Sequence, residues 1–175
     1  MPEIIKDKTI VADDWHLLKL AEGETPESVS VPAGKQIVPL AVWLAQKPAL
    51  GERTDIGVWL APDERAESLK DDAARLPLIA VDFPSFVDGR GYSTAFHLRT
   101  RIGFTGELRA IGDVLRDQLF YLQRVGFNAF ATRPDRSITE ALKGLTDFSD
   151  VYQTSWDQKT PLFRRATRPA AGELQ

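Results

Sequence analysis

The sequence of 175 residues contains no cysteine and only two histidines, His16 and His97. Without thiols the chain cannot form a disulfide, use a thiolate nucleophile or ligate an iron–sulfur cluster with its own side chains. The histidines match no metal-binding spacing, so we interpret both as surface or packing residues. We therefore expect no metal and no cofactor on this chain. In any redox reaction, a bound cofactor or a partner would have to carry the electrons.

A strong charge imbalance and long apolar runs are also missing. The chain has 22 basic and 25 acidic residues, which leaves no basic footprint for nucleic acid. No apolar run is long enough to span a membrane, and the N-terminal residues 1–6 lack the apolar core of a signal peptide. We expect a cytoplasmic protein that binds neither nucleic acid nor membrane.

The apolar content of 43% is enough for one sizeable core. We predict a single α/β domain over residues 1–166 with an N-terminal layer of strands and a helix, followed by a flexible C-terminal tail, residues 167–175. The first half of the chain predicts one or two strands in 4–15, a helix from Pro39 that Pro48 stops, a strand at 56–60, and a charged helix over 64–76 capped by Asp63.

The second half alternates short apolar runs with amphipathic runs. It predicts strands at 78–83, 107–111 and 127–131. It also predicts three helices: the first ends at Gly103, the second is capped by Asp113 and ends at Gly126, and the third begins at Ser137 or Thr139. Three strand–helix units in a row imply parallel strands with right-handed crossovers. A complete eight-fold barrel needs about 250 residues, so the length favours a small sheet or a partial-barrel-like arc.

Polar side chains gather where the predicted strands end. In parallel sheets those ends lie on one side, so these residues are candidates for a ligand site: Asp82, Asp88, Arg90, Gly112, Asp113, Arg133 and Asp135. The two arginines suit an anion, and Asp82 or Asp113 suits a base or a metal ligand. Helix capping and turn formation explain Asp113 and Asp88 equally well. The run 89–94 lacks the third glycine of a dinucleotide fingerprint.

The aromatic residues divide into two groups. Trp43 and Trp59 lie in apolar runs typical of a core, whereas Trp15 and Trp156 flank polar segments. If Trp15 and Trp156 are exposed together with Phe120 and Tyr121, these aromatic residues would suit a protein–protein surface. The alternative is that they pack in the core or at the edge of the domain.

Several motifs together resemble a bacterial family of unknown function (domain of unknown function nine-three-four). They occur in order between Val38 and Gln153: Val38–Ala45, Gly57–Pro62, Ala80–Pro84, Asp88–Ser93, Gly103–Ala110 and Gly112–Leu119. The resemblance implies a gene encoded beside sulfite or nitrite reductase in sulfate-assimilation operons. Members are often labelled as oxidoreductases involved in sulfite reduction, and the family has no established catalytic residue.

The oxidoreductase label fits the residues poorly. Sulfite reduction takes six electrons and, in the familiar enzyme, a siroheme coupled to a cysteine-ligated cluster, which a chain without cysteine cannot ligate. We therefore expect a non-catalytic accessory protein of assimilatory sulfite reduction with sulfite reductase as its partner. The alternatives are a small-anion-binding α/β enzyme or oxidoreductase with its ligand at the strand ends, and a homodimer whose features are all structural.

Overall fold

The computed structural model describes residues 2–165, so the predicted tail, residues 167–175, lies outside the described part. The strands are β1 (Glu3–Lys6), β2 (Thr9–Ala12), β3 (His16–Leu17), β4 (Gln36–Pro39), β5 (Ile56–Leu60), β6 (Leu78–Phe83), β7 (Glu107–Gly112) and β8 (Ala129–Phe130). The α-helices are α1 (Leu40–Leu50), α2 (Arg90–His97), α3 (Arg116–Val125), α4 (Ile138–Lys143) and α5 (Leu162–Arg165). Shorter helical turns are η1 (Ala66–Leu69), η2 (Leu98–Ile102) and η3 (Gly144–Thr146).

All eight strands form one sheet in the order β2-β1-β8-β7-β6-β5-β4-β3. From β3 to β8 each neighbouring pair is parallel, and β1 joins β8 and β2 in antiparallel register. The predicted mixed α/β fold with parallel strand–helix units is confirmed. The N-terminal strands belong to this same sheet: β2 and β3 are its edges, and β1 lies between β2 and β8.

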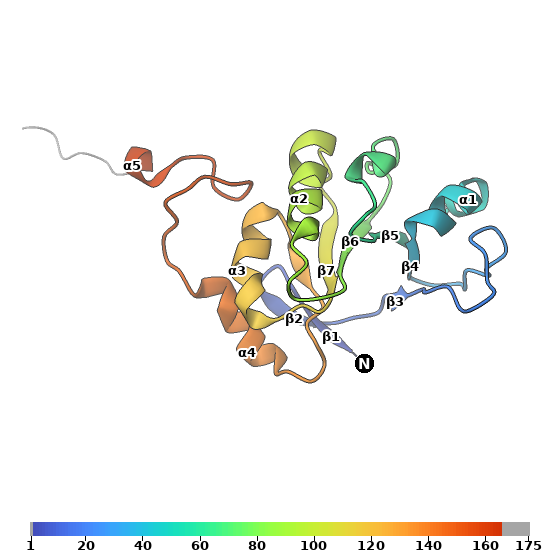
Figure 1. The fold of residues 1–175 in the computed structure, drawn as a ribbon, viewed down its shortest axis with the longest axis horizontal. Coiled ribbons are helices and arrows are strands. Elements are labelled where there is room, and N and C mark those ends of the chain that lie inside the picture. The colour runs from blue at the N-terminus through green and yellow to red at the C-terminus, as the bar shows by residue number, and fades with distance from the viewer. Residues whose placement is uncertain (1, 166–175) are drawn as a thin grey trace, which may run out of the picture.

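The sheet curls into a partial-barrel-like arc (Figure 1). Its two edge strands, β2 and β3, are consecutive in the chain and are joined only by Asp13, Asp14 and Trp15. A connection of this length spans at most about 14 Å, so the two edges must lie close together. We call residues 13–15 the strap. It crosses the open side of the arc, and Trp15 packs against the apolar inner face.

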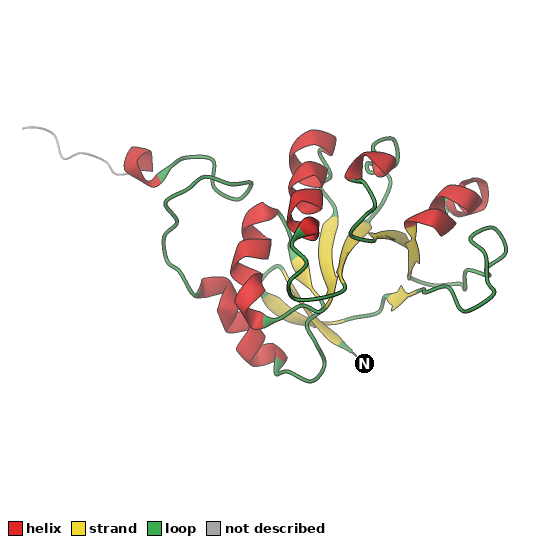
Figure 2. Cartoon of the chain, in the orientation of Figure 1, coloured by secondary structure: helices red, strands yellow, loops and turns green. Residues whose placement is uncertain are grey.

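The main core lies between the sheet and the helices on its outer face (Figure 2). Alternate strand residues such as Val58, Val81 and Leu108 point into this layer and are completely buried. The inner face carries a second, smaller apolar cluster of Ile37, Leu78, Ala80 and Ile111, with Trp15, Trp59 and Ala131 packed against it. Within residues 2–165 no helix combines the length and apolar character needed to cross a bilayer.

Two predicted helices differ from the structure. Pro48 does not stop α1, because the helical turns kink at Gln46 and resume, so that Pro48 lies inside the final turns. The predicted helix over 64–76 is only η1 followed by turns, because Asp72 points inward to the indole of Trp43. The strand β4 was not predicted from the sequence, where Pro39 indicated only a helix start.

The predicted capping role of Asp113 is wrong. Helix α3 begins at Arg116, and Gln118 Oε1 accepts the backbone N–H of Leu115 at 2.9 Å. The carboxylate of Asp113 is engaged elsewhere, as described below. The predicted cap Asp63 is also wrong, because η1 begins at Ala66 after Arg65 and has no side-chain cap. The remaining caps agree with the sequence: Gly103 and Gly126 end their helices with φ of 77° and 118°, and Ser137 accepts the backbone N–H of Glu140.

Candidate functional site

A cavity of about 310 Å³ opens on the inner face of the arc, at the C-terminal ends of the parallel strands. This is the edge at which parallel α/β sheets commonly bind ligands. The residues lining the cavity come from the segment after the strap and from β3 to β7: Leu17, Lys19, Leu20, Pro39, Trp59, Asp82 and Ile111.

Asp82 is the carboxylate of this cavity. It is half-buried near the end of β6, and burial raises the pKa of its carboxyl above the ordinary range, with a smaller contribution from Asp88 and an opposing one from Lys19. Within the described residues its side chain has neither a hydrogen bond nor a salt bridge. The backbone of the neighbouring strand comes close: a Cβ on Gly112, whose φ is 92°, would lie 2.6 Å from Asp82 Oδ1.

Trp59 connects the cavity wall to the N-terminal segment. Its indole Nε1–H donates to the carbonyl of Leu18 at 3.0 Å, although the two residues are 41 positions apart. This bond holds residues 17–20 against the ends of β4 and β5. The cavity wall formed by Leu17, Lys19 and Leu20 therefore has a defined position.

Below the cavity, the inner face carries a chain of four alternating charges. Glu107 forms salt bridges with Lys6 at 2.8 Å and with Arg109 at 2.7 Å. Arg109 Nη1 also donates to both carboxylate oxygens of Asp13 at 3.0 Å. The side chains of Arg109 and Glu107 are only 3% and 7% exposed. Each buried charge has a partner of opposite sign, so this network is satisfied internally and holds the strap in place.

The predicted residues Asp88 and Arg90 form a local pair outside the cavity. Arg90 Nε and Nη2 donate to the two carboxylate oxygens of Asp88 at 3.0 and 2.7 Å, and the backbone N–H of Arg90 adds a third bond. The hydrogen bond from Arg90 lowers the pKa of the Asp88 carboxyl. This geometry matches the turn that was one of the two interpretations of Asp88.

Asp113 and Arg133 are brought together, 3.1 Å apart, and Arg133 also holds Asp135 at 2.8 Å. The second oxygen of Asp113 accepts the backbone N–H of Phe86 at 2.9 Å. Asp113 therefore ties the loop after β6 to the loop after β8. The seven candidates thus divide among three places: Asp82 with Gly112 at the cavity, Asp88 with Arg90, and Asp113 with Arg133 and Asp135.

Besides Trp59, five lining residues were not site candidates at the level of sequence: Leu17, Lys19, Leu20, Pro39 and Ile111. Leu17, Lys19 and Leu20 lie in a segment that shows no motif, Pro39 indicated only a helix start, and Ile111 was assigned to a strand. Trp59 was expected in the core, but it is only partly buried and faces the cavity. No local sequence signal predicts that residues 17–20 lie beside the ends of strands that occur much later in the chain.

The cavity offers groups that can bind a ligand. One carboxylate and one ammonium lie among apolar walls, an arrangement that can orient a small molecule by charge and cover its apolar part. In residues 2–165 no three His, Asp or Glu side chains gather closely enough to hold a metal ion.

Comparison with known proteins supports the resemblance of the motifs. No curated protein matches the chain. The model of a bacterial protein family of unknown function, DUF934, matches residues 57–163, more than half of the chain and all the strands from β6 to β8. The chain therefore belongs to the DUF934 family of bacterial proteins of unknown function.

Proposed function

We propose that this protein is a non-catalytic accessory protein of assimilatory sulfite reduction, which acts by binding sulfite reductase. Two considerations support this role. The resemblance implies that the gene lies beside the reductase gene, and the chain has no cysteine with which to ligate the cluster of that enzyme. A partner that assists assembly, loading or electron delivery needs a docking surface rather than redox groups of its own.

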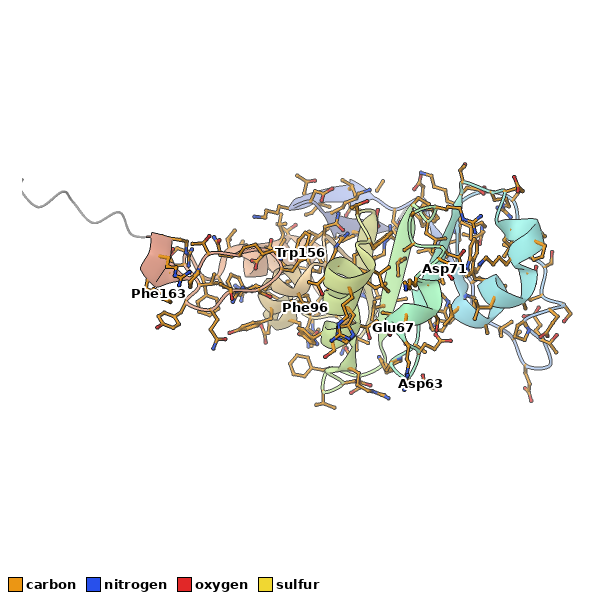
Figure 3. The ribbon with its side chains drawn as sticks, turned by 90° about the horizontal axis from the view of Figure 1, so that it is seen from above. Asp63, Glu67, Asp71, Phe96, Trp156 and Phe163 are labelled. Carbon is orange, nitrogen blue, oxygen red and sulfur yellow. The ribbon has the colours of Figure 1, made fainter. Side chains whose placement is uncertain are left out.

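The observation that carries the proposal is a set of exposed aromatic side chains on α3 and on the segment from residue 148 to α5. Tyr121, Phe148, Tyr152 and Phe163 are 54%, 55%, 70% and 65% exposed, and we call these four residues the aromatic surface. It begins on α3 and continues along the segment that projects beyond α4 to α5, where Phe163 lies (Figures 1 and 3). Phe120 is buried and supports it, with ring contacts to Tyr121 and Phe148 at 5.6 and 4.9 Å.

Exposed aromatic groups of this kind are typical of protein interfaces. Tyr and Phe are enriched at such surfaces because they provide a large apolar contact area at a small loss of side-chain entropy. The segment beneath them is held by polar contacts: the backbone N–H of Asp157 donates to the carbonyl of Arg124, and Trp156 lies against the guanidinium of Arg99. The aromatic surface is therefore presented from a structured support.

The small-anion alternative receives less support from the geometry. An anion at Arg90 would compete with Asp88, and one at Arg133 would compete with both Asp113 and Asp135. The cavity itself contains a carboxylate, Asp82, which repels anions.

Affinity capture tests the proposal. Tagged protein expressed in its own bacterium at native level is expected to retain sulfite reductase. The combined variant Tyr121→Ser, Phe148→Ser, Tyr152→Ser is expected to lose it. Phe96→Ser is the matched control, because Phe96 is also exposed, at 37%, but lies on α2 away from the aromatic surface.

Growth of a deletion strain gives the functional readout. Growth on sulfide but not on sulfate or sulfite is expected if the protein serves sulfite reduction, and the triple variant should fail to restore growth on sulfite. The proposal is wrong if no reductase is captured and the deletion strain grows normally on sulfate.

A further inference from the structure

The cavity beside Asp82 is apolar on most sides. Five of the seven lining residues are apolar: Leu17, Leu20, Pro39, Trp59 and Ile111. Leu17 and Leu20 are 40% and 36% exposed, so an apolar group in the cavity would cover leucine surface that water now contacts. The cavity is therefore suited to the apolar part of a small molecule.

Two opposite charges face the same space. Asp82 and Lys19 both line the cavity, and Lys19 acts on the carboxyl of Asp82 through space. They lie too far apart for a direct salt bridge, and within residues 2–165 neither side chain has another ion-pair partner. Asp82 is the more desolvated of the two groups, which strengthens its interaction with any cation that enters.

A molecule that carries both an ammonium and a carboxylate would satisfy both groups at once. Charge-assisted hydrogen bonds to Asp82 and Lys19 would orient it, and its apolar part would pack against Leu17 and Trp59. We propose that this cavity binds a small zwitterion, an α-amino acid with an apolar side chain, with its ammonium at Asp82 and its carboxylate at Lys19.

The size of the cavity limits the ligand class. At about 310 Å³ it lies at the lower end of ligand-binding cavities, which span roughly 300 to 1,000 Å³. This volume suits a molecule the size of an amino acid and is too small to enclose a flavin or a dinucleotide. The proposal does not involve the aromatic surface, so it stands or falls independently of reductase binding.

Isothermal titration calorimetry with three related probes tests the assignment on the full chain. L-phenylalanine carries both charges, 2-phenylethylamine lacks the carboxylate, and 3-phenylpropionate lacks the ammonium. L-phenylalanine is expected to bind with a Kd of about 1 mM or tighter. Each analogue with a single charge is expected to bind at least about tenfold more weakly.

Two substitutions assign each charge to its partner. Asp82→Asn is expected to abolish the preference for L-phenylalanine over 3-phenylpropionate, because the site for the ammonium is lost. Lys19→Met is expected to abolish the preference over 2-phenylethylamine, and because Lys19 is exposed this variant should fold normally. Asp135→Asn is the control, since Arg133 holds Asp135 outside the cavity.

Three results would overturn the proposal. The first is no measurable binding of L-phenylalanine or L-leucine at about 10 mM, a concentration well above the expected Kd. The second is binding of a singly charged analogue as tight as that of L-phenylalanine. The third is unchanged selectivity in Lys19→Met, which would show that the carboxylate of the ligand is bound elsewhere.

Discussion

Arg109 and Asp13 lie 96 positions apart in the chain, yet Nη1 of the arginine donates to both carboxylate oxygens of the aspartate at 3.0 Å. Arg109 lies on the inner face of β7, and Asp13 belongs to the strap between the two edge strands. This pair therefore fixes the path of the N-terminal segment across the arc. It also positions the residues that continue into the cavity wall.

Replacing Asp13 should destabilise the fold substantially. In Asp13→Asn the guanidinium of Arg109, only 3% exposed, keeps Glu107 as its one anionic partner, so we expect a loss of about 2–3 kcal/mol in the free energy of unfolding. Urea denaturation measures this. Asp14→Asn is the adjacent control, because Asp14 pairs with Lys35 at the surface and should leave stability unchanged. Equal effects of the two substitutions would contradict the role of the strap.

Asp72 should make stability depend on pH. Burial acts to raise the pKa of its carboxyl, but hydrogen bonds from Lys47, Trp43 and Arg75 outweigh burial and hold the pKa below the ordinary range. A carboxyl whose pKa is lower in the folded state stabilises the protein above its unfolded pKa. That stabilisation is lost as pH falls through the folded pKa.

Thermal unfolding as a function of pH checks this effect. The wild-type midpoint should fall as the pH is lowered from about 5 to about 3. Asp72→Asn should be less stable at neutral pH and should show a shallower fall. Asp71→Asn changes an exposed neighbour and should retain the wild-type pH profile. A profile of Asp72→Asn parallel to that of the wild type would rule out this contribution.

Gly112 should be intolerant of a side chain. Its φ is 92°, and a Cβ would lie 2.4 Å from the carbonyl oxygen of Phe83 and close to Asp82. We expect Gly112→Ala to cost about 3 kcal/mol, because backbone strain adds to a clash with backbone atoms that cannot move aside. Gly103→Ala is the control: its φ is 77° with open space around the added methyl, so about 1 kcal/mol is expected. Similar losses in chemical denaturation would show that the clash is relieved.

Arg99 should not be replaceable by lysine. Its guanidinium donates to the carbonyls of Phe104, Gly106 and Gly126 and to the side chain of Asn128, and burial lowers its pKa to about 10. An ammonium cannot reach four separated acceptors, so Arg99→Lys should cost about 3 kcal/mol. Hydrogen exchange should then rise at the starts of β7 and β8. Arg101→Lys, on the exposed side of the same turn, should be neutral, and a neutral Arg99→Lys would disprove the prediction.

The part of the fold that could be predicted from sequence is the part in which local signals agree. The strands β6 and β7 are short apolar runs, and Gly103 and Gly126 end the helices that follow β6 and β7 with the left-handed backbone that glycine adopts easily. These features depend on residues a few positions apart. The same runs carry the family motifs, so the sequence alone is enough to recognise the family.

Local signals failed where a distant partner decided the outcome. Asp113 has the side chain of a helix cap, but Arg133 and the backbone of Phe86 engage it instead. The charged run from 64 to 76 has helical composition, but Asp72 turns inward to reach Trp43 and Lys47. In both cases tertiary hydrogen bonds to a buried or half-buried carboxylate outweigh helix propensity, which contributes only weakly per residue.

The sequence by itself determined the class of fold, the parallel strand–helix units, the family and the position of Asp82 at the end of a strand. Only the tertiary structure decided that the sheet curls until its two edges are joined by the strap. It also decided that Lys19 and two leucines from the N-terminal segment complete the cavity around Asp82. The physical reason for this division is that local periodicity depends only on residues that are close together in the sequence. The curvature of a sheet and the pairing of its edges arise instead from contacts between segments far apart in the chain.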